Sequence, residues 1–253
     1  MRNFELGWSN CEIVKQGSNV TADQNKSLQD ELKLEAARRA LDLVKPGMTV
    51  GLGSGSTATL WIRLVGEQVR DHGLNIRAIA SSPDSEALGR SYGIPFVTFE
   101  EYARLDLTVD GADEIAPGLA LIKGGGGKLL REKIVASASE RFVIIADESK
   151  IVDILGNAPL PVEVIPMAVP LVGPVLRKLG FRTVAARTHP DGSRYVTDQG
   201  NLLLDCSGMR IENPQSIADE LDHVVGVVEH GLFLGMADLA IIACQSQIIE
   251  RTR

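Results

Sequence analysis

Residues 121–135 read Leu121-Ile122-Lys123-Gly124-Gly125-Gly126-Gly127-Lys128-Leu129-Leu130-Arg131-Glu132-Lys133-Ile134-Val135, a run of four glycines followed by a segment with helical spacing. Glycines leave the backbone nearly bare, so the N–H groups of such a loop can approach an anion closely. The helix that follows adds unpaired N–H groups and the positive end of its dipole. Glu132 falls within about two helical turns of this anion site. The segment predicts an anion-binding loop with a carboxylate placed for proton transfer beside Lys123; the alternative is a surface turn and a solvent-facing Glu.

The composition is that of a globular chain. The 253 residues are 44% hydrophobic and 23% charged, and no apolar run approaches the roughly 20 residues that span a bilayer. A net charge of −7 argues against general nucleic-acid binding, which requires a basic face. The first residues lack the charged-then-apolar order of a secretory signal. We therefore expect a cytoplasmic protein that binds neither nucleic acid nor membrane.

Apolar periodicity predicts alternating helices and strands in the first part of the chain. Residues 1–26 show no periodicity and are interpreted as a tail. The stretch 141–146 is apolar without alternation, which is typical of a strand covered on both faces. Repeated strand-then-helix order with such strands predicts an α/β, Rossmann-like, mostly parallel sheet. The expected helices are 27–45, 57–65, 84–92 and one beginning near 129, and the expected strands are 48–52, 76–80, 95–98, 105–109, 119–122, 141–146 and 236–244.

A Gly/Pro cluster at 156–161 predicts a domain boundary. Beyond it, two strand-helix-strand units predict a smaller α+β domain of split βαβ, ferredoxin-like type. The expected domains are a catalytic domain of residues 27–156 and 230–253 and a small domain of residues 157–229. In the small domain we expect strands at 162–165, 183–186, 195–197, 201–205 and 226–229, and helices at 168–179 and 214–222.

A second glycine-containing loop, at 51–57, follows the first predicted strand. Ser56 stands where a dinucleotide fingerprint needs its third glycine, and no acidic residue ends a second strand about twenty residues later. The loop also lacks the Gly-Lys-Ser/Thr ending of a nucleotide P-loop. Its N–H groups and the hydroxyls of Ser54, Ser56 and Thr57 instead suit one monophosphate. A simple capped turn is the alternative.

Acidic and basic side chains follow two further strands. Asp110, Asp113 and Glu114 come just after one strand, on the side where open α/β sheets bind ligands. They are candidates for binding a divalent metal, orienting sugar hydroxyls or exchanging protons, and no His lies nearby to favour a metal. Helix capping is the structural alternative. Lys150 follows a buried strand at the same predicted edge, where it is either a ligand contact or a surface lysine.

Taken together, these segments resemble the ribose-5-phosphate isomerase family, type A. The order and spacing match from about Asp30 to the C-terminus. The resemblance implies a two-domain α/β fold that forms a homodimer or homotetramer. It also implies cofactor-free and metal-free interconversion of D-ribose 5-phosphate and D-ribulose 5-phosphate in the non-oxidative pentose phosphate pathway. The matching motifs are Gly53-Ser54-Gly55-Ser56-Thr57, Asp110-Gly111-Ala112-Asp113-Glu114, Lys123-Gly124-Gly125-Gly126-Gly127, Leu130-Arg131-Glu132-Lys133 and Asp147-Glu148-Ser149-Lys150.

The resemblance also implies roles for individual residues. Glu132 matches the general base, with Asp110 and Lys123 as further catalytic residues. Lys33, in Asp30-Glu31-Leu32-Lys33, is similar to an N-terminal-helix lysine that reaches the site in some members. Lys128 departs from the family, which often has a small residue there. The implied substrate-binding residues are Lys33, Ser54, Gly55, Ser56, Thr57, Asp110, Gly111, Ala112, Asp113, Lys123, Gly124, Gly125, Gly126 and Lys150.

The implied reaction moves a proton from carbon 2 to carbon 1 of the sugar through a cis-enediolate. In this hypothesis Glu132 carries the proton, Lys123 and the glycine N–H groups stabilise the enediolate oxygen, and Asp110 moves a proton between the two oxygens. Asp113 would hold sugar hydroxyls.

Two other function classes share features with these residues. Coenzyme A transferases use related sheets and a nucleophilic Glu, and need a larger cleft. A non-enzymatic sugar-phosphate sensor would need a DNA-binding segment, for which residues 1–26 offer neither basic character nor a helix-turn-helix pattern.

Overall fold

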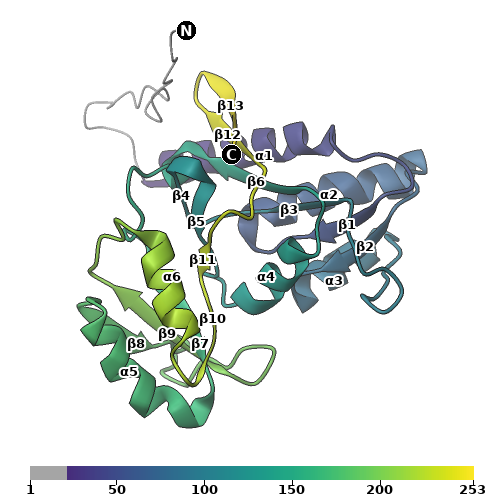
Figure 1. The fold of residues 1–253 in the computed structure, drawn as a ribbon. Helices are drawn as coiled ribbons and strands as arrows, with labels where there is room; N and C mark the ends of the chain where they lie inside the picture. The colour runs from purple at the N-terminus through teal and green to yellow at the C-terminus, as the bar shows by residue number, and fades with distance from the viewer. Residues whose placement is uncertain (1–21) are drawn as a thin grey trace, which may run out of the picture.

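The computed structural model describes residues 22–253 (Figure 1). The predicted tail, residues 1–26, lies outside this range except for its last five positions, which belong to helix α1 (Ala22–Leu41). The helix thus begins earlier than the predicted residue 27 and ends before the predicted residue 45. Residues 25–27, near its start, are exposed and show no apolar periodicity. The chain turns after Leu41, with the Val44 N–H donating to the Leu41 carbonyl ahead of Pro46.

The larger sheet has six strands in the order β13-β12-β6-β3-β1-β2. All neighbouring pairs are parallel except β12 with β13, so the predicted mostly parallel sheet is confirmed. The edge strand β13 was not predicted. The strands are β1 (Thr49–Leu52), β2 (Arg77–Ala80), β3 (Leu107–Asp110), β6 (Phe142–Asp147), β12 (Leu239–Cys244) and β13 (Gln247–Thr252).

Both faces of this sheet are covered, as the unbroken apolar run in β6 predicts. Val143 and Ile145 belong to a core shared with α1 and α2 (Gly55–His72). Ile144 and Ala146 face the other way, into a core shared with α4 (Leu129–Ser137) and a small three-stranded sheet. Alternate residues of one strand therefore serve two cores. The remaining helix is α3 (Pro83–Ser91), and the small sheet, in the order β11-β5-β4, contains β4 (Glu114–Ala116), β5 (Ala120–Ile122) and β11 (Leu232–Phe233).

The four-stranded sheet lies apart from the larger one, in the lower part of Figure 1, and its strands run antiparallel in the order β10-β7-β9-β8. With two helices on the chain between its strands, it has the predicted βαββαβ, ferredoxin-like arrangement. Most of one apolar core lies within these elements, and this core continues into Ala116, Ile122 and Leu232 of the three-stranded sheet. Residues 157–229 are here called the small domain, and their independence as a domain stays a prediction. The elements are β7 (Leu160–Val164), α5 (Val169–Lys178), β8 (Thr183–Ala186), β9 (Leu202–Ser207), α6 (Pro214–Asp222) and β10 (Val227–His230).

Two predicted strands are wrong. Residues 95–98 form only an isolated bridge, between Phe96 and Ala78. Residues 195–197 likewise form only a bridge, between Val196 and Leu202, within a long excursion from β8 to β9. Short 3-10 helices occur at Pro117–Leu119, Glu148–Lys150 and Pro166–Ala168.

The carboxyl ends of three parallel strands meet beside the start of the small domain. Strand β1 ends at Leu52, β3 at Asp110 and β6 at Asp147. Since all three run in the same direction, their following loops gather at one edge of the sheet, where open α/β sheets bind ligands. Within residues 22–253, no helix combines the length and the apolar character that crossing a bilayer requires.

Candidate active site

One pocket lies at this sheet edge, with a volume of about 110 Å³. It brings together loops that are far apart in sequence and that the sequence analysis had selected separately. The lining residues are Ser54, Gly55, Ser56, Thr57, Gly111, Ala112, Asp113, Lys123, Gly124, Gly125, Gly126 and Lys150. The pocket is therefore built from the two glycine loops, the loop after β3 and the lysine after β6.

A buried cluster of three charged side chains lies directly under this pocket. Lys123, Asp110 and Glu132 are each less than 5% exposed. The Lys123 ammonium nitrogen lies 2.9 Å from Asp110 Oδ2 and 3.3 Å from Glu132 Oε2. It also donates a hydrogen bond of 2.6 Å to the Gly111 carbonyl. One ammonium thus stands between two carboxylates in a site shielded from water, where electrostatic interactions are stronger than in bulk solvent.

Glu132 is held with its carboxylate toward the pocket. It lies in the first turn of α4, where the helix dipole favours negative charge. The Ser54 hydroxyl donates a hydrogen bond to Oε1. The other oxygen, Oε2, has no hydrogen-bond partner among the described residues and faces the Lys123 ammonium. Because Ser54 and Lys123 both line the pocket, a group bound there lies next to this carboxylate, and the solvent-facing alternative for Glu132 is wrong.

Asp110 is fixed by backbone groups as well as by Lys123. Its Oδ1 accepts hydrogen bonds from the N–H groups of Ser54, at 2.9 Å, and Gly111, at 2.7 Å. A glycine must precede Ser54, because a Cβ at Gly53 would lie 2.3 Å from Asp110 Oδ1. The glycine at position 53 therefore leaves the space that the Asp110 carboxylate occupies.

The burial of the cluster changes its protonation equilibria. Burial raises the pKa of Asp110 from its ordinary value of 3.8 to about 6; the Lys123 ammonium opposes this rise and the Glu132 carboxylate adds to it. For Lys123, burial alone lowers the pKa, but the neighbouring Asp110 and Glu132 carboxylates outweigh it and hold the pKa above its ordinary value. Lys123 is therefore a permanent cation, whereas Asp110 exchanges its proton close to neutral pH.

The glycine loop is shaped by positive backbone angles and by a carboxylate. Gly124 has a φ of +93°, a conformation that other residues rarely adopt. The N–H of Gly125 donates to Asp113 Oδ2 at 2.7 Å. Asp113 thus orders the loop and at the same time lines the pocket. In the other glycine-containing loop of the pocket, Ser54 forms the N-cap of α2.

Two of the residues selected from the sequence lie elsewhere. Lys33 is on α1, with its ammonium 3.1 Å from Asp30, and is not among the residues that line the pocket. Glu114, one of the three clustered carboxylates, points away from the site and accepts a 2.7 Å hydrogen bond from the N–H of Gly156. Lys128, the departure from the family pattern, pairs with Asp198 of the small domain at 2.7 Å.

Two residues of the small domain that were not predicted from the sequence contact the glycine loop. Arg187 donates to the Gly125 carbonyl at 2.9 Å, and the Tyr195 hydroxyl donates to the Gly126 carbonyl at 3.2 Å. Both lie about sixty residues further along the chain and belong to no motif near the loop, so local spacing carries no signal for them.

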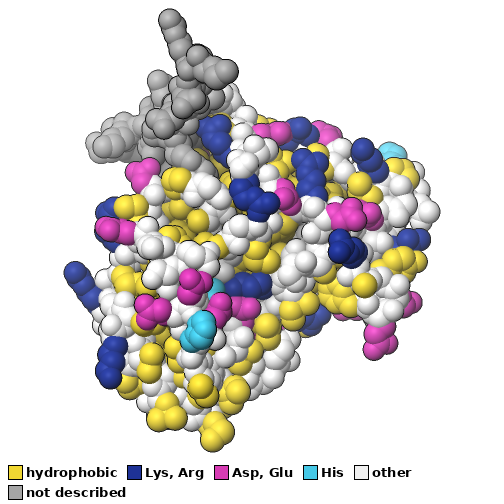
Figure 2. All heavy atoms as spheres, viewed as in Figure 1, with side chains coloured by type: hydrophobic (Ala, Val, Ile, Leu, Met, Phe, Trp, Pro, Cys, Tyr) yellow, Lys and Arg dark blue, Asp and Glu magenta, His cyan; other side chains and the backbone are white. Residues whose placement is uncertain are grey.

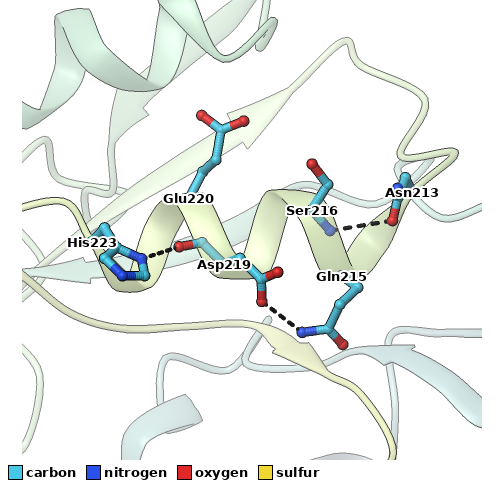
Figure 3. A pocket seen from close by; sticks show the side chains of 6 residues that line it. All are labelled: Asn213, Gln215, Ser216, Asp219, Glu220 and His223. Atoms are coloured by element: carbon cyan, nitrogen blue, oxygen red, sulfur yellow. Dashed lines mark hydrogen bonds between the residues drawn. The ribbon is translucent and has the colours of Figure 1, made fainter.

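A larger hollow, of about 470 Å³, lies along α6 but has the character of a surface groove (Figure 3). Its side chains are exposed and bind one another: Asn213 caps the N–H of Ser216, and Gln215 donates to Asp219 at 2.7 Å. These are ordinary helix-capping and helix-surface contacts. No buried charged group converges on this hollow, so the strand-end pocket is the candidate active site.

Fold and site together define an α/β protein with a ferredoxin-like four-stranded sheet and a small strand-end pocket above a buried lysine and two carboxylates. A family model described as ribose 5-phosphate isomerase A (phosphoriboisomerase A) matches residues 77–247. The chain belongs to the ribose 5-phosphate isomerase A family. It is 51% identical over 213 residues to ribose-5-phosphate isomerase A of Gluconobacter oxydans, an alignment that covers 83% of this chain and 92% of that protein.

Solved structures agree with this assignment. Ribose 5-phosphate isomerase A from Methanocaldococcus jannaschii is 38% identical and superposes with a TM-score of 0.84, covering 88% of this chain and 99% of the other. A D-ribose-5-phosphate isomerase in complex with phospho-erythronic acid is 33% identical, with a TM-score of 0.86 over 89% of this chain and 99% of that one. The resemblance stated from the motifs is thereby confirmed, as are the fold class and the family.

Proposed function

We propose that this chain interconverts D-ribose 5-phosphate and D-ribulose 5-phosphate as an aldose–ketose isomerase of the non-oxidative pentose phosphate pathway. Membership of the family supports the activity. The observation that carries the chemistry is the buried Glu132 carboxylate, which lies beside Lys123 and Ser54 at the floor of the pocket.

Glu132 acts as the base that takes the proton from carbon 2 and returns it to carbon 1. The electron pair of the broken C–H bond forms the C1–C2 double bond of the cis-enediolate, and the carbonyl oxygen gains negative charge. A positioned base accelerates a reaction by roughly 10²–10⁴-fold, so stabilisation of the developing charge has to supply the remaining rate enhancement. The Lys123 ammonium and the free N–H groups of the glycine loop donate hydrogen bonds to this oxygen, and each such donor contributes a factor on the order of 10²–10³ to the rate.

Asp110 moves the hydroxyl proton between oxygen 2 and oxygen 1. Its contact with Lys123 and its pKa of about 6 allow it to hold or release a proton near neutral pH. Asp113 accepts hydrogen bonds from sugar hydroxyls with the oxygen that does not bind Gly125.

The phosphate is bound by Ser56 and Thr57 at the start of α2, and by Lys150, which lines the same pocket. This remote anchor supplies positioning energy for the reacting carbons. Ser54, in the same loop, lines the pocket at the end where its hydroxyl binds Glu132. Neither a metal nor an organic cofactor has a role in these steps.

The direct test is to mix the pure protein with ribose 5-phosphate and a chelator and to measure ketose formation. Turnover supports the isomerase. Covalent capture of an acyl group from acyl-coenzyme A would instead indicate a transferase, and binding without turnover would indicate a sensor. The role of Glu132 is tested in the same assay with the Glu132→Gln variant. Glu140→Gln is its matched control, since Glu140 is exposed just beyond the same helix.

We also propose that the protein is a cytoplasmic homodimer or homotetramer. Figure 2 shows apolar side chains collecting at the lower end of the molecule, over the small domain. Large apolar side chains exposed there include Met167, Leu171 and Val225, at 85%, 73% and 94%. Exposed apolar groups of this size are typical of contact surfaces between proteins. Light scattering on the eluting protein tests the oligomer directly.

A further inference from the structure

The glycine loop of the pocket is held on its outer side by the excursion between β8 and β9 of the small domain. Arg187, at the start of this excursion, donates from one guanidinium nitrogen to the Gly125 carbonyl at 2.9 Å and to the Gly124 carbonyl at 3.4 Å. Tyr195, further along, donates to the Gly126 carbonyl. Neither residue lines the pocket. They contact carbonyls of the glycine loop without lining the pocket, and we take theirs to be the rear side of the loop.

Arg187 is itself firmly anchored. Its Nε donates to Asp205 Oδ2 at 2.9 Å, and Nη2 donates to the other oxygen of the same carboxylate. Such a two-point contact fixes the plane of the guanidinium. Its backbone N–H donates to the Leu203 carbonyl on β9. The remaining nitrogen is thus aimed at the glycine loop by the small domain sheet.

The backbone bonds of the loop leave the N–H groups of Gly124 and Gly126 without an acceptor within residues 22–253, and that of Gly126 lies in the middle of the loop. The N–H of Gly125 is used by Asp113, and that of Gly127 donates to the Gly124 carbonyl at 2.8 Å. Between them, the N–H of Gly126 has no acceptor within residues 22–253. In a trans peptide the C=O of one residue and the N–H of the next point in opposite directions, and none of the described peptide bonds is cis. Holding the Gly125 carbonyl therefore fixes the direction of the Gly126 N–H.

We propose that Arg187 is a positioning residue for the isomerase reaction. By binding the Gly125 carbonyl from behind, it turns the Gly126 N–H into the pocket as a donor to the enediolate oxygen. A guanidinium on the carbonyl end of a peptide also polarises its N–H end and strengthens it as a donor. The inference rests on the proposed isomerase function and adds a contribution of the small domain to transition-state stabilisation.

Arg187→Met and Arg187→Lys test this, with Arg177→Met as the matched control. Arg177 also lies in the small domain and donates to a backbone carbonyl, that of Val184, but does not reach the loop. We expect Arg187→Met to lower kcat by about tenfold or more while KM changes less than about threefold, because a donor specific to the transition state is misdirected. Arg187→Lys should recover part of kcat, and Arg177→Met should match the wild type.

Binding probes separate this role from a merely structural one. Phospho-erythronic acid carries a carboxylate where the enediolate charge develops, so Arg187→Met should weaken its binding by about tenfold or more. Inorganic phosphate, which probes only the phosphate end, should bind as to the wild type. If Arg187→Met does not fold, Asp205→Asn, which loosens the same guanidinium, replaces it.

Two results would overturn the proposal: a kcat within twofold of wild type in the folded variant, or an equal weakening of both probes. Failure of the proposed function itself is distinct, since the wild type would then show no turnover at all.

Discussion

Replacing Asp110 with Asn should change how the stability of the protein depends on pH. The folded-state pKa of Asp110 is about 6, against an ordinary value of 3.8, with burial as the largest cause. The native state therefore binds this proton more tightly than the unfolded chain does. It follows that the contribution of Asp110 to the free energy of unfolding falls as pH rises from about 4 to about 6, and stays level above that. This sign is opposite to that of a salt-bridged surface carboxylate.

The size of the effect follows from the two pKa values. Each pKa unit corresponds to about 1.4 kcal/mol, so ionised Asp110 costs the folded state about 3 kcal/mol relative to the protonated form. Asn resembles the protonated acid in shape and cannot ionise. The Asp110→Asn variant should equal the wild type in stability near pH 4 and exceed it by about 3 kcal/mol near pH 7.

Guanidinium unfolding of both proteins across this pH range measures the difference. Taking the difference between variant and wild type removes the titration of all other groups that the substitution leaves unchanged. The reasoning about the buried cluster would be refuted if the difference in unfolding free energy did not change with pH. It would also be refuted if the wild type became more stable relative to the variant as pH rises. The variant should also lose most isomerase activity, since the carboxamide cannot relay a proton between the sugar oxygens.

Three further substitutions probe the rest of the site. Lys123→Met leaves two buried carboxylates without their cation, so the free energy of unfolding should drop by about 3–5 kcal/mol in chemical denaturation. Ser54→Ala removes the hydroxyl that binds Glu132, and steady-state kinetics should show kcat reduced by about tenfold with the fold intact. Gly127→Ala should lower the melting temperature, because the φ of Gly127 is +81° and the new Cβ would lie 2.3 Å from the Tyr195 hydroxyl. Gly126→Ala is the control: its new Cβ would meet no atom within 4 Å, so the melting temperature should stay unchanged.

The sequence predicts the elements whose pattern is local. Strand β6 was predicted because both of its faces are apolar, and the predicted helix 214–222 matches α6. Strand β13 was missed because only Ile249 among its residues is buried, so this edge strand has no apolar pattern to recognise. Residues 25–27, which α1 includes and the prediction gave mostly to the tail, are likewise exposed.

The candidate site could be predicted only as far as its residues lie in motifs. Residue type and spacing alone do not separate Asp110, Asp113 and Glu114, and only the family resemblance gave the two aspartates different roles. In the structure Asp110 joins the buried cluster, Asp113 orders the glycine loop and Glu114 binds the chain at Gly156. The three side chains take different positions because Asp110 ends β3, Asp113 lies in the loop and Glu114 begins β4. The contacts of Arg187 and Tyr195 with the glycine loop join segments about sixty residues apart, which no local pattern encodes.

The central claim is that one carboxylate carries the proton between the two carbons of the sugar. Its most direct test is the kcat of Glu132→Gln with ribose 5-phosphate, measured beside the binding of phospho-erythronic acid and beside the Glu140→Gln control. The amide keeps the shape of the side chain and removes the base. We expect turnover to be abolished, with the analogue bound nearly as well as by the wild type and the control fully active. Retention of more than about a tenth of the wild-type kcat would contradict the account, since a lost general base costs roughly 10²–10⁴ in rate.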